Sequence, residues 1–385
     1  MRLLHYIKPM LEKTSIYAHI PFCRSKCAYC DFASFAGIER LMKPYVAALA
    51  REIEAAPRLA APTVYIGGGT PSYLPAEFMD AVLGGITGHF SIDEGAEFTV
   101  EANPGTALEG GFRLWRRHGV NRLSIGSQSF DDRLLKNIGR AHTSAATRET
   151  FAAARAAGFD NVSLDLMYGL PGQTMDGLKD DLGTLLDLRP EHISAYQLIL
   201  EEGTPLEKMV GEGSVRLPDD DEVCDMGEAI TVALENAGFR HYEISNYALS
   251  GRECRHNTAC WLGKPFLGLG SGAHSFMNGR RLANPDDVEE YIHLIESKGC
   301  AASEIATDEK ARMADYLLMR LRLINKEVEF EELDNTLNIN FKEHFKEALA
   351  KLQKDKYMVI TDSSLRLSNK GIQYLDDVLL ELLKV

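Results

Sequence analysis

The sequence predicts an α/β protein: an incomplete (β/α)6 barrel, followed by an α+β extension and a C-terminal helical, winged-helix-like module. Two patterns predict the barrel. Short apolar β-type runs alternate with longer helical patterns from Ser15 to about Leu200, and turn residues such as Gly158 stop the helical patterns. Strand, helix and strand repeated in this way imply parallel strands with right-handed crossovers. Six such strands are two fewer than a complete eightfold barrel needs, so we expect an incomplete one.

The barrel elements follow from these runs. The expected strands are Ser15–Ile20, Val64–Ile66, Glu97–Ala102, Arg122–Ser127, Asn161–Met167 and His192–Leu198. Helical patterns between them include Lys43–Ala56, Pro75–His89, Ala107–His118 and Thr143–Ala157. We therefore assign residues 15–215 to the partial barrel.

The rest of the chain changes character twice. Residues 216–300, the α+β extension, combine a helix at Asp219–Ala237 with a glycine-rich segment, Phe266–His274, which we expect to form turns and no helix. Residues 301–385 contain amphipathic helices at Glu309–Leu323 and Phe341–Asp355, then an apolar pair, Tyr357–Thr361 and Leu365–Ser368, typical of a hairpin. This module has no basic face, so we expect it to dock a partner or act as a lid and not to bind DNA.

Composition excludes several functional classes. The net charge of −14 disfavours binding to nucleic acid or anionic lipid, and no apolar run is long enough to span a membrane. Residues Met1–Lys13 lack the apolar core of a secretory signal. The seven cysteines are an odd number, and three of them lie within eight positions. Metal binding in a reducing compartment, the cytoplasm, is therefore favoured over a disulfide framework.

The strongest motif is CxxxCxxC, formed by Cys23, Cys27 and Cys30 directly after the first strand. Three thiolates so close together can hold three irons of a 4Fe–4S cluster and leave the fourth iron open. A structural zinc site is the alternative, but zinc of that kind takes four protein ligands, and the position two residues beyond Cys30 is Phe32.

Polar and glycine residues follow the other strands. Gly67, Gly68, Gly69 and Thr70 end the second strand, where a bare backbone would let a ligand approach. The ends of the later strands carry Glu101, Asn103, Gln128, Asp165, Tyr196 and Gln197. In a parallel barrel these ends form one mouth, where active sites lie. With Arg140 nearby, the set would suit a small zwitterionic ligand that carries a sugar.

These motifs resemble the radical S-adenosylmethionine (SAM) superfamily, and in particular its HemN-like branch, from Tyr17 to the C-terminal module. The branch contains oxygen-independent coproporphyrinogen III dehydrogenases and heme chaperones. The resemblance implies that Cys23, Cys27 and Cys30 hold the cluster and that the amino and carboxylate groups of SAM occupy its open iron. It also implies the residues that contact SAM: Tyr17, Tyr29, Gly68, Gly69, Thr70, Glu101, Gln128, Arg140 and Asp165.

Three features favour the chaperones of this branch. The dehydrogenases typically carry a fourth cysteine at the position of Phe32 and a longer N-terminal segment than the short stretch before Ser15. The run from His256 to Trp261 resembles the chaperone signature HNxxYW, with Cys260 in place of the tyrosine. The resemblance makes His256 the expected heme ligand, in a loop, with His274 as a rival. Cys260 is either a soft axial ligand or a small buried residue.

We therefore expect a heme chaperone that uses a 4Fe–4S cluster and SAM and delivers heme to apo-hemoproteins of the respiratory chain. The alternative is a radical SAM enzyme that decarboxylates coproporphyrinogen III oxidatively. The sequence leaves open the final heme acceptor, turnover of SAM, a homodimer, and peripheral membrane association through partners.

Overall fold

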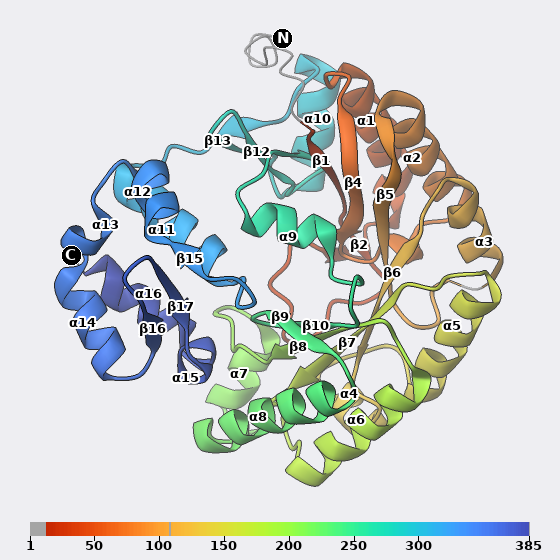
Figure 1. Ribbon diagram of the computed structural model, residues 1–385. Helices are drawn as coiled ribbons and strands as arrows, with labels where there is room; N and C mark the ends of the chain where they lie inside the picture. The colour runs from red at the N-terminus through yellow and green to blue at the C-terminus, as the bar shows by residue number, and fades with distance from the viewer. Residues whose placement is uncertain (1–12, 108, 385) are drawn as a thin grey trace.

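The computed structural model describes residues 13–107 and 109–384. Its central feature is a sheet with strand order β14-β13-β12-β11-β1-β4-β5-β6-β7-β8-β10-β9, curved so that helices cover its outer face (Figure 1). The six predicted barrel strands are all present, neighbouring and parallel. Their bounds are β1 Ser15–Ile20, β4 Ala60–Gly68, β5 Ser91–Ala102, β6 Arg122–Gln128, β7 Val162–Tyr168 and β8 His192–Gln197. The partial-barrel prediction is confirmed.

Helices follow these strands and bury their apolar stripes against the sheet. Met42, Tyr45, Leu49 and Ile53 of the first long helix, for example, recur at helical spacing and are buried. The outer helices are α1 Met42–Ala55, α2 Ala76–His89, α3 Glu109–Arg117, α4 Asp132–Asn137, α5 Ser144–Ala156, α6 Met175–Leu188, α7 Pro205–Gly211, α8 Asp220–Asn236 and α10 Val288–Lys298. Single-turn 3₁₀ helices lie at Glu39–Leu41 and Pro71–Tyr73.

The segment expected as an α+β extension continues the barrel sheet at both edges. β9 (Arg240–Glu243) and β10 (Asn246–Ala248) extend it beyond β8. At the other edge lie β11 (Phe266–Leu269), β12 (His274–Met277), β13 (Arg280–Ala283) and β14 (Ser303–Glu304). As expected, Phe266–His274 forms no helix and contains a turn, after Leu269, but its first four residues form β11, which pairs in parallel with β1. Gly268 allows the contact with β12, since a Cβ there would meet the His274 carbonyl oxygen at 2.0 Å.

The run that resembles the chaperone signature is a helix, α9 (Arg255–Trp261), and not the expected loop. It lies inside the ring of the barrel in Figure 1. Glu97 explains why a helix begins there: its carboxylate accepts hydrogen bonds from the backbone N–H groups of Arg255 and His256, at 2.9 Å each. A long-range carboxylate thus satisfies the first turn, so no local capping residue marks the helix in the sequence.

The C-terminal module has a hydrophobic core of its own, with Leu317, Phe341 and Val378 among its buried residues. The predicted hairpin is present as β16 (Met358–Ile360) and β17 (Ser364–Leu367), and β15 (Val328–Glu329) adds a third strand. The helices are α11 Glu309–Leu321, α12 Phe330–Leu337, α13 Phe341–His344, α14 Lys346–Lys354, α15 Asn369–Gln373 and α16 Leu375–Leu383. The domain bounds 15–215, 216–300 and 301–385 stay a prediction.

Within residues 13–107 and 109–384, no helix is long and apolar enough to cross a membrane. The expectations for Met1–Lys13 and for the short stretch before Ser15 concern residues that, up to position 12, lie outside the described part of the chain.

Candidate functional site: the mouth of the barrel

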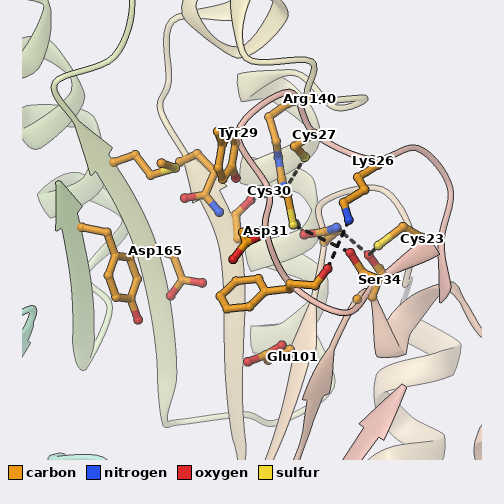
Figure 2. Close-up of a pocket in the computed structure, with 18 of the residues that line it drawn as sticks. Cys23, Lys26, Cys27, Tyr29, Cys30, Asp31, Ser34, Glu101, Arg140 and Asp165 are labelled. Carbon is orange, nitrogen blue, oxygen red and sulfur yellow. Dashed lines mark hydrogen bonds between the residues drawn. The ribbon is translucent and has the colours of Figure 1, made fainter. Parts of the chain in front are cut away.

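A cavity of about 420 Å³ lies at the carboxyl ends of the parallel strands (Figure 2). It brings together residues that are far apart in the sequence, as expected for the mouth of a parallel barrel. Its lining includes all three cysteines of the motif and eight of the expected SAM contacts: Tyr29, Gly68, Gly69, Thr70, Glu101, Gln128, Arg140 and Asp165. Tyr17 does not line it. That ring lies one layer deeper, stacked on Tyr65, whose hydroxyl donates to Glu101.

The cysteine loop is closed at its base by a short parallel ladder of β2 (Phe22–Cys23) and β3 (Phe35–Ala36). The backbone of Ala28 pins its middle: Ala28 N–H donates to the Ile138 carbonyl at 3.0 Å, and the Ala28 carbonyl accepts from Leu206 N–H at 2.8 Å. These contacts fix the loop between the segments that follow β6 and β8, and all three cysteines line the cavity.

Polar side chains lie beside each thiol. The hydroxyl oxygens of Thr70 and Ser34 lie 3.5 Å from Cys23 Sγ and 3.7 Å from Cys30 Sγ, respectively. Arg140 Nη1 donates to Cys27 Sγ at 3.5 Å (Figure 2). Hydrogen bonds to the sulfurs are one of the means by which a protein tunes the potential of an iron–sulfur cluster. Ser34 could not be predicted as a neighbour of the cluster loop cysteines, because a serine in a loop carries no distinctive pattern.

The glycine run at the end of β4 is needed because neighbouring atoms of the protein leave no room for a Cβ there. A Cβ at Gly67 would come within 2.9 Å of the Glu101 carboxyl group, and one at Gly68 within 2.7 Å of the His19 ring. At Gly69 it would meet Phe22 O at 2.9 Å and Cys23 Sγ at 3.0 Å. The expected reason, room for a ligand, is therefore only part of the explanation: these glycines let β4 pack against the cysteine loop.

Two buried carboxyl groups face the cavity. Burial raises the pKa of Glu101 to about 7, against hydrogen bonds from the Tyr65 hydroxyl at 2.7 Å and Gly68 N–H at 3.1 Å. Burial likewise raises the pKa of Asp165 to about 6, although Ser124 Oγ donates to it at 3.1 Å. Acids held in this way gain from a cationic ligand, which would favour their charged forms.

Arg140 and Gln128 each have a buried polar atom without a hydrogen-bond partner in the described part of the chain. These atoms are Arg140 Nε and Gln128 Oε1. Arg140 Nη2 donates to Asn103 Oδ1 at 2.8 Å and to the Gly126 carbonyl at 2.6 Å. Gln128 adopts a left-handed backbone, with φ of 62°, where β6 loses register with β7. Unsatisfied atoms and backbone strain of this kind are found at ligand sites.

The rim of the mouth is apolar and exposed. Phe32 is 72% exposed, Ile199 62% and Tyr196 40%, and all three border the cavity. Exposed apolar groups gathered around a cavity mark a surface where another molecule binds. Phe32 also occupies the position at which a fourth cysteine would have faced the same cavity.

His256 lies apart from the mouth, near the amino-terminal ends of the strands. Its ring is 4% exposed, and its Nδ1 is 2.9 Å from the hydroxyl oxygen of Thr63. Burial, together with the charge of Arg122, lowers its pKa to about 3, so the ring is neutral. Heme ligation by His256 stays a prediction, and it would require the ring to leave a site that the barrel encloses. The rival, His274, is exposed on β12.

Comparison with known proteins agrees with this geometry. The model of the radical SAM superfamily matches residues 17–185, and that of the HemN C-terminal domain matches residues 307–374. A protein of Lactococcus lactis named heme chaperone HemW is 34% identical over 94% of this chain and 96% of its own length. A Bacillus subtilis protein of the same name is 38% identical over 80% of this chain and 83% of its own. The chain belongs to the HemW family.

A solved structure gives the fold of this HemW-family chain independently. The Escherichia coli HemN structure, titled as coproporphyrinogen III oxidase and a radical SAM enzyme, superposes with a TM-score of 0.84. It covers 99% of this chain and 92% of the other, at 21% sequence identity, which supports the shared fold alone.

Membership of the radical SAM superfamily implies a 4Fe–4S cluster and SAM, and the mouth suits both. Three thiols from one loop are the donor set of a cluster with one open iron. The unsatisfied atoms of Arg140 and Gln128 and the carboxyl groups of Glu101 and Asp165 provide both donors and acceptors for a charged, hydroxyl-bearing ligand.

Proposed function

We propose that this chain is a heme chaperone, which binds heme and delivers it to apo-hemoproteins and uses a 4Fe–4S cluster and SAM to do so. The observation that carries the proposal is the relation to a heme chaperone along 94% of the chain, which includes both the barrel and the C-terminal module. A relation confined to the barrel would have supported radical SAM chemistry in general and no particular cargo.

We propose that Cys23, Cys27 and Cys30 hold the cluster, whose open iron would supply a binding point for SAM and a source of electrons. Arg140 and Glu101 would hold the methionine part of SAM, and Gln128 and Asp165 its ribose hydroxyls. Their positions around one cavity support these roles, as do the polar atoms that Arg140 and Gln128 leave unsatisfied. Tyr17 would act indirectly, through Tyr65 and Glu101.

The alternative, oxidative decarboxylation of coproporphyrinogen III, is less well supported. The fold similarity to HemN does not decide between the two activities, because the fold is shared. Phe32 argues against the enzyme: the dehydrogenase pattern has a cysteine there, and this chain places an exposed phenyl ring at the mouth.

The proposed acceptors are apo-hemoproteins of the respiratory chain, reached from a cytoplasmic location. The net charge of −14 favours proteins over nucleic acids as binding partners of this chain. A homodimer and peripheral membrane association through partners belong to the same proposal as ways of meeting such acceptors.

The experiment is heme transfer from the reconstituted protein to an apo-cytochrome b. Anaerobically reconstituted protein should contain about four irons per chain at the cluster and bind about one heme. It should transfer that heme faster than free hemin is taken up, and it should not convert coproporphyrinogen III to protoporphyrinogen IX in a reduced, SAM-supplemented assay.

Cys27→Ala is the matched variant for the cluster, and Cys300→Ala, far from the mouth, is its control. The first should abolish the iron–sulfur absorbance and the second should leave it intact. Absence of saturable heme binding by the unmodified protein would overturn the chaperone proposal. Robust production of protoporphyrinogen IX would replace it with the alternative.

A further inference from the structure

A second cavity, of about 460 Å³, lies where the barrel meets the C-terminal module and away from the cluster loop. Its volume is within the range of small-molecule sites, and junctions between domains are a common place for such sites. The lining comes from α9, the strand edge β11–β13, and helices α11 and α12. None of the residues that line the barrel mouth takes part in it.

The cavity has two apolar walls of different origin. One wall is the sheet edge, where Phe266 of β11 and Phe276 of β12 are directly paired across the strands and so present their rings on one face. The other is α11, which contributes Met313, Tyr316 and Met319 at helical spacing. A space between a sheet and a helix, lined by rings and thioethers, suits a flat apolar molecule.

Two arginines, Arg281 and Arg312, line this space together with two carboxylates, Glu309 and Asp315. Arg281 of β13 is held by Asp315 of α11, with Nε 2.6 Å from Oδ2, and its guanidinium lies 5.8 Å from the centre of the Phe276 ring. Arg312 also lines the cavity and is exposed. Guanidinium groups beside an apolar space match a ligand that is apolar in its body and carries carboxylates at its edge.

Cys260 brings a metal ligand to the same space. It is the position of α9 at which the chaperone signature has tyrosine, and its side chain lines this cavity while His256 of the same helix faces the barrel interior. Burial raises the pKa of the Cys260 thiol to about 12. Cysteine thiolate and tyrosine phenolate are both known axial ligands of heme iron, so the exchange of one for the other preserves an anionic ligand.

We propose that heme binds in this cavity, between the paired rings of Phe266 and Phe276 and the face of α11, with Cys260 as its axial ligand and Arg281 and Arg312 near its propionates. This rests on the proposed chaperone function and gives its cargo a site separate from the cluster. On binding ferric heme, the S–H bond of Cys260 breaks, an Fe–S bond forms and the proton passes to solvent. The iron keeps its oxidation state, so no further reactant is needed.

The test compares two ligands, hemin and iron-free protoporphyrin IX, on the full-length reconstituted protein. Cys260→Ser should weaken hemin binding at least tenfold and remove the spectral signature of a thiolate-ligated ferric heme. It should leave the affinity for iron-free protoporphyrin IX unchanged, because only the iron needs the thiolate. Cys260→Tyr should retain hemin with the spectrum of a phenolate complex. Cys300→Ser is the control cysteine and should change neither.

A second variant blocks the space itself. Thr336→Trp, at an exposed position that lines the cavity, should weaken both ligands, whereas Asn335→Trp, its exposed neighbour outside the lining, should weaken neither. Cys27→Ala should still bind hemin with the same spectrum, since it removes only the cluster. If hemin binding were lost in Cys27→Ala but unchanged in Cys260→Ser and Thr336→Trp, the heme site would lie at the mouth and this inference would be wrong. The chaperone function would stand in that case and would fall only if the unmodified protein bound no hemin.

Discussion

Arg140 Nη1 lies 3.5 Å from the sulfur of Cys27, while Nη2 of the same guanidinium donates to Asn103 Oδ1 and to the Gly126 carbonyl. One side chain thereby joins the cysteine loop to the ends of β5 and β6. The fork of the guanidinium is needed for this arrangement, because a lysine ammonium cannot reach all three acceptors from one position.

Arg140→Lys should therefore keep the charge but lose the geometry. We expect the cluster to assemble and the affinity for SAM to fall by about tenfold or more, which corresponds to about 1.4 kcal/mol. Iron content and equilibrium dialysis of SAM measure the two effects. Arg24→Lys, an exposed substitution on the same loop, is the control. Unchanged SAM affinity in Arg140→Lys would remove Arg140 from the SAM site.

Gly69→Ala should damage the cluster itself. The new Cβ would stand 2.9 Å from Phe22 O and 3.0 Å from Cys23 Sγ, so the cysteine loop must shift to admit it. We expect iron per chain to fall by half or more after reconstitution. Gly183→Ala, in α6 with open space around it, should retain full iron content. A Gly69→Ala protein with a normal cluster and weaker SAM binding would instead show that the residue acts only on the ligand.

SAM binding should strengthen as pH rises. SAM is cationic, and Glu101, whose pKa burial raises to about 7, attracts it only when ionised. The affinity should increase about tenfold between pH 5.5 and 7.5 and then level off. Glu101→Gln should bind more weakly with a flatter profile. The stability of the unliganded protein should show the opposite trend. Between the ordinary value of 4.5 and about 7 the folded form holds the extra proton, so stability falls as pH rises through that window. A SAM affinity independent of pH would show that the charge of Glu101 does not contribute to SAM binding.

His256→Ala should lower the stability of the fold and leave heme binding unchanged. The substitution removes a buried ring and its contact with Thr63, which we expect to lower the free energy of unfolding by about 2 kcal/mol. Hemin binding and spectrum should be unchanged at a temperature where the variant is folded. His274→Ala, at an exposed position of β12, should change stability by less than about 0.5 kcal/mol. Loss of the heme spectrum in a folded His256→Ala protein would restore the ligand role that the sequence suggested.

The local sequence pattern is sufficient to predict an element whose bounds are set by its own residues. β1 was predicted to the residue, because its apolar run is bounded by Thr14 and Pro21. The residues at the mouth could also be predicted, because parallel strands bring their carboxyl ends together whatever the details of packing.

Long-range contacts explain the failures. β11 contains Gly268, which reads as a turn residue, and only the approach of β12 shows why it is needed. The helix α9 begins on the carboxylate of Glu97, more than 150 residues earlier in the chain. The cavity that Cys260 faces likewise exists only once two parts of the chain have met, so the sequence could name Cys260 but could not locate this space.

The helix α9 also has a consequence for biosynthesis. Thr63 and His256 are 193 residues apart, and Glu97 and His256 are 159 apart, yet they form one buried polar layer across the barrel. A ribosome that has released only the six parallel strands has not yet supplied the helix that fills this layer. Contacts of such separation form late, so the nascent barrel exposes Glu97 and its neighbours until α9 emerges. Chains truncated before Arg255 should therefore aggregate or be degraded, even though every cluster ligand is already present.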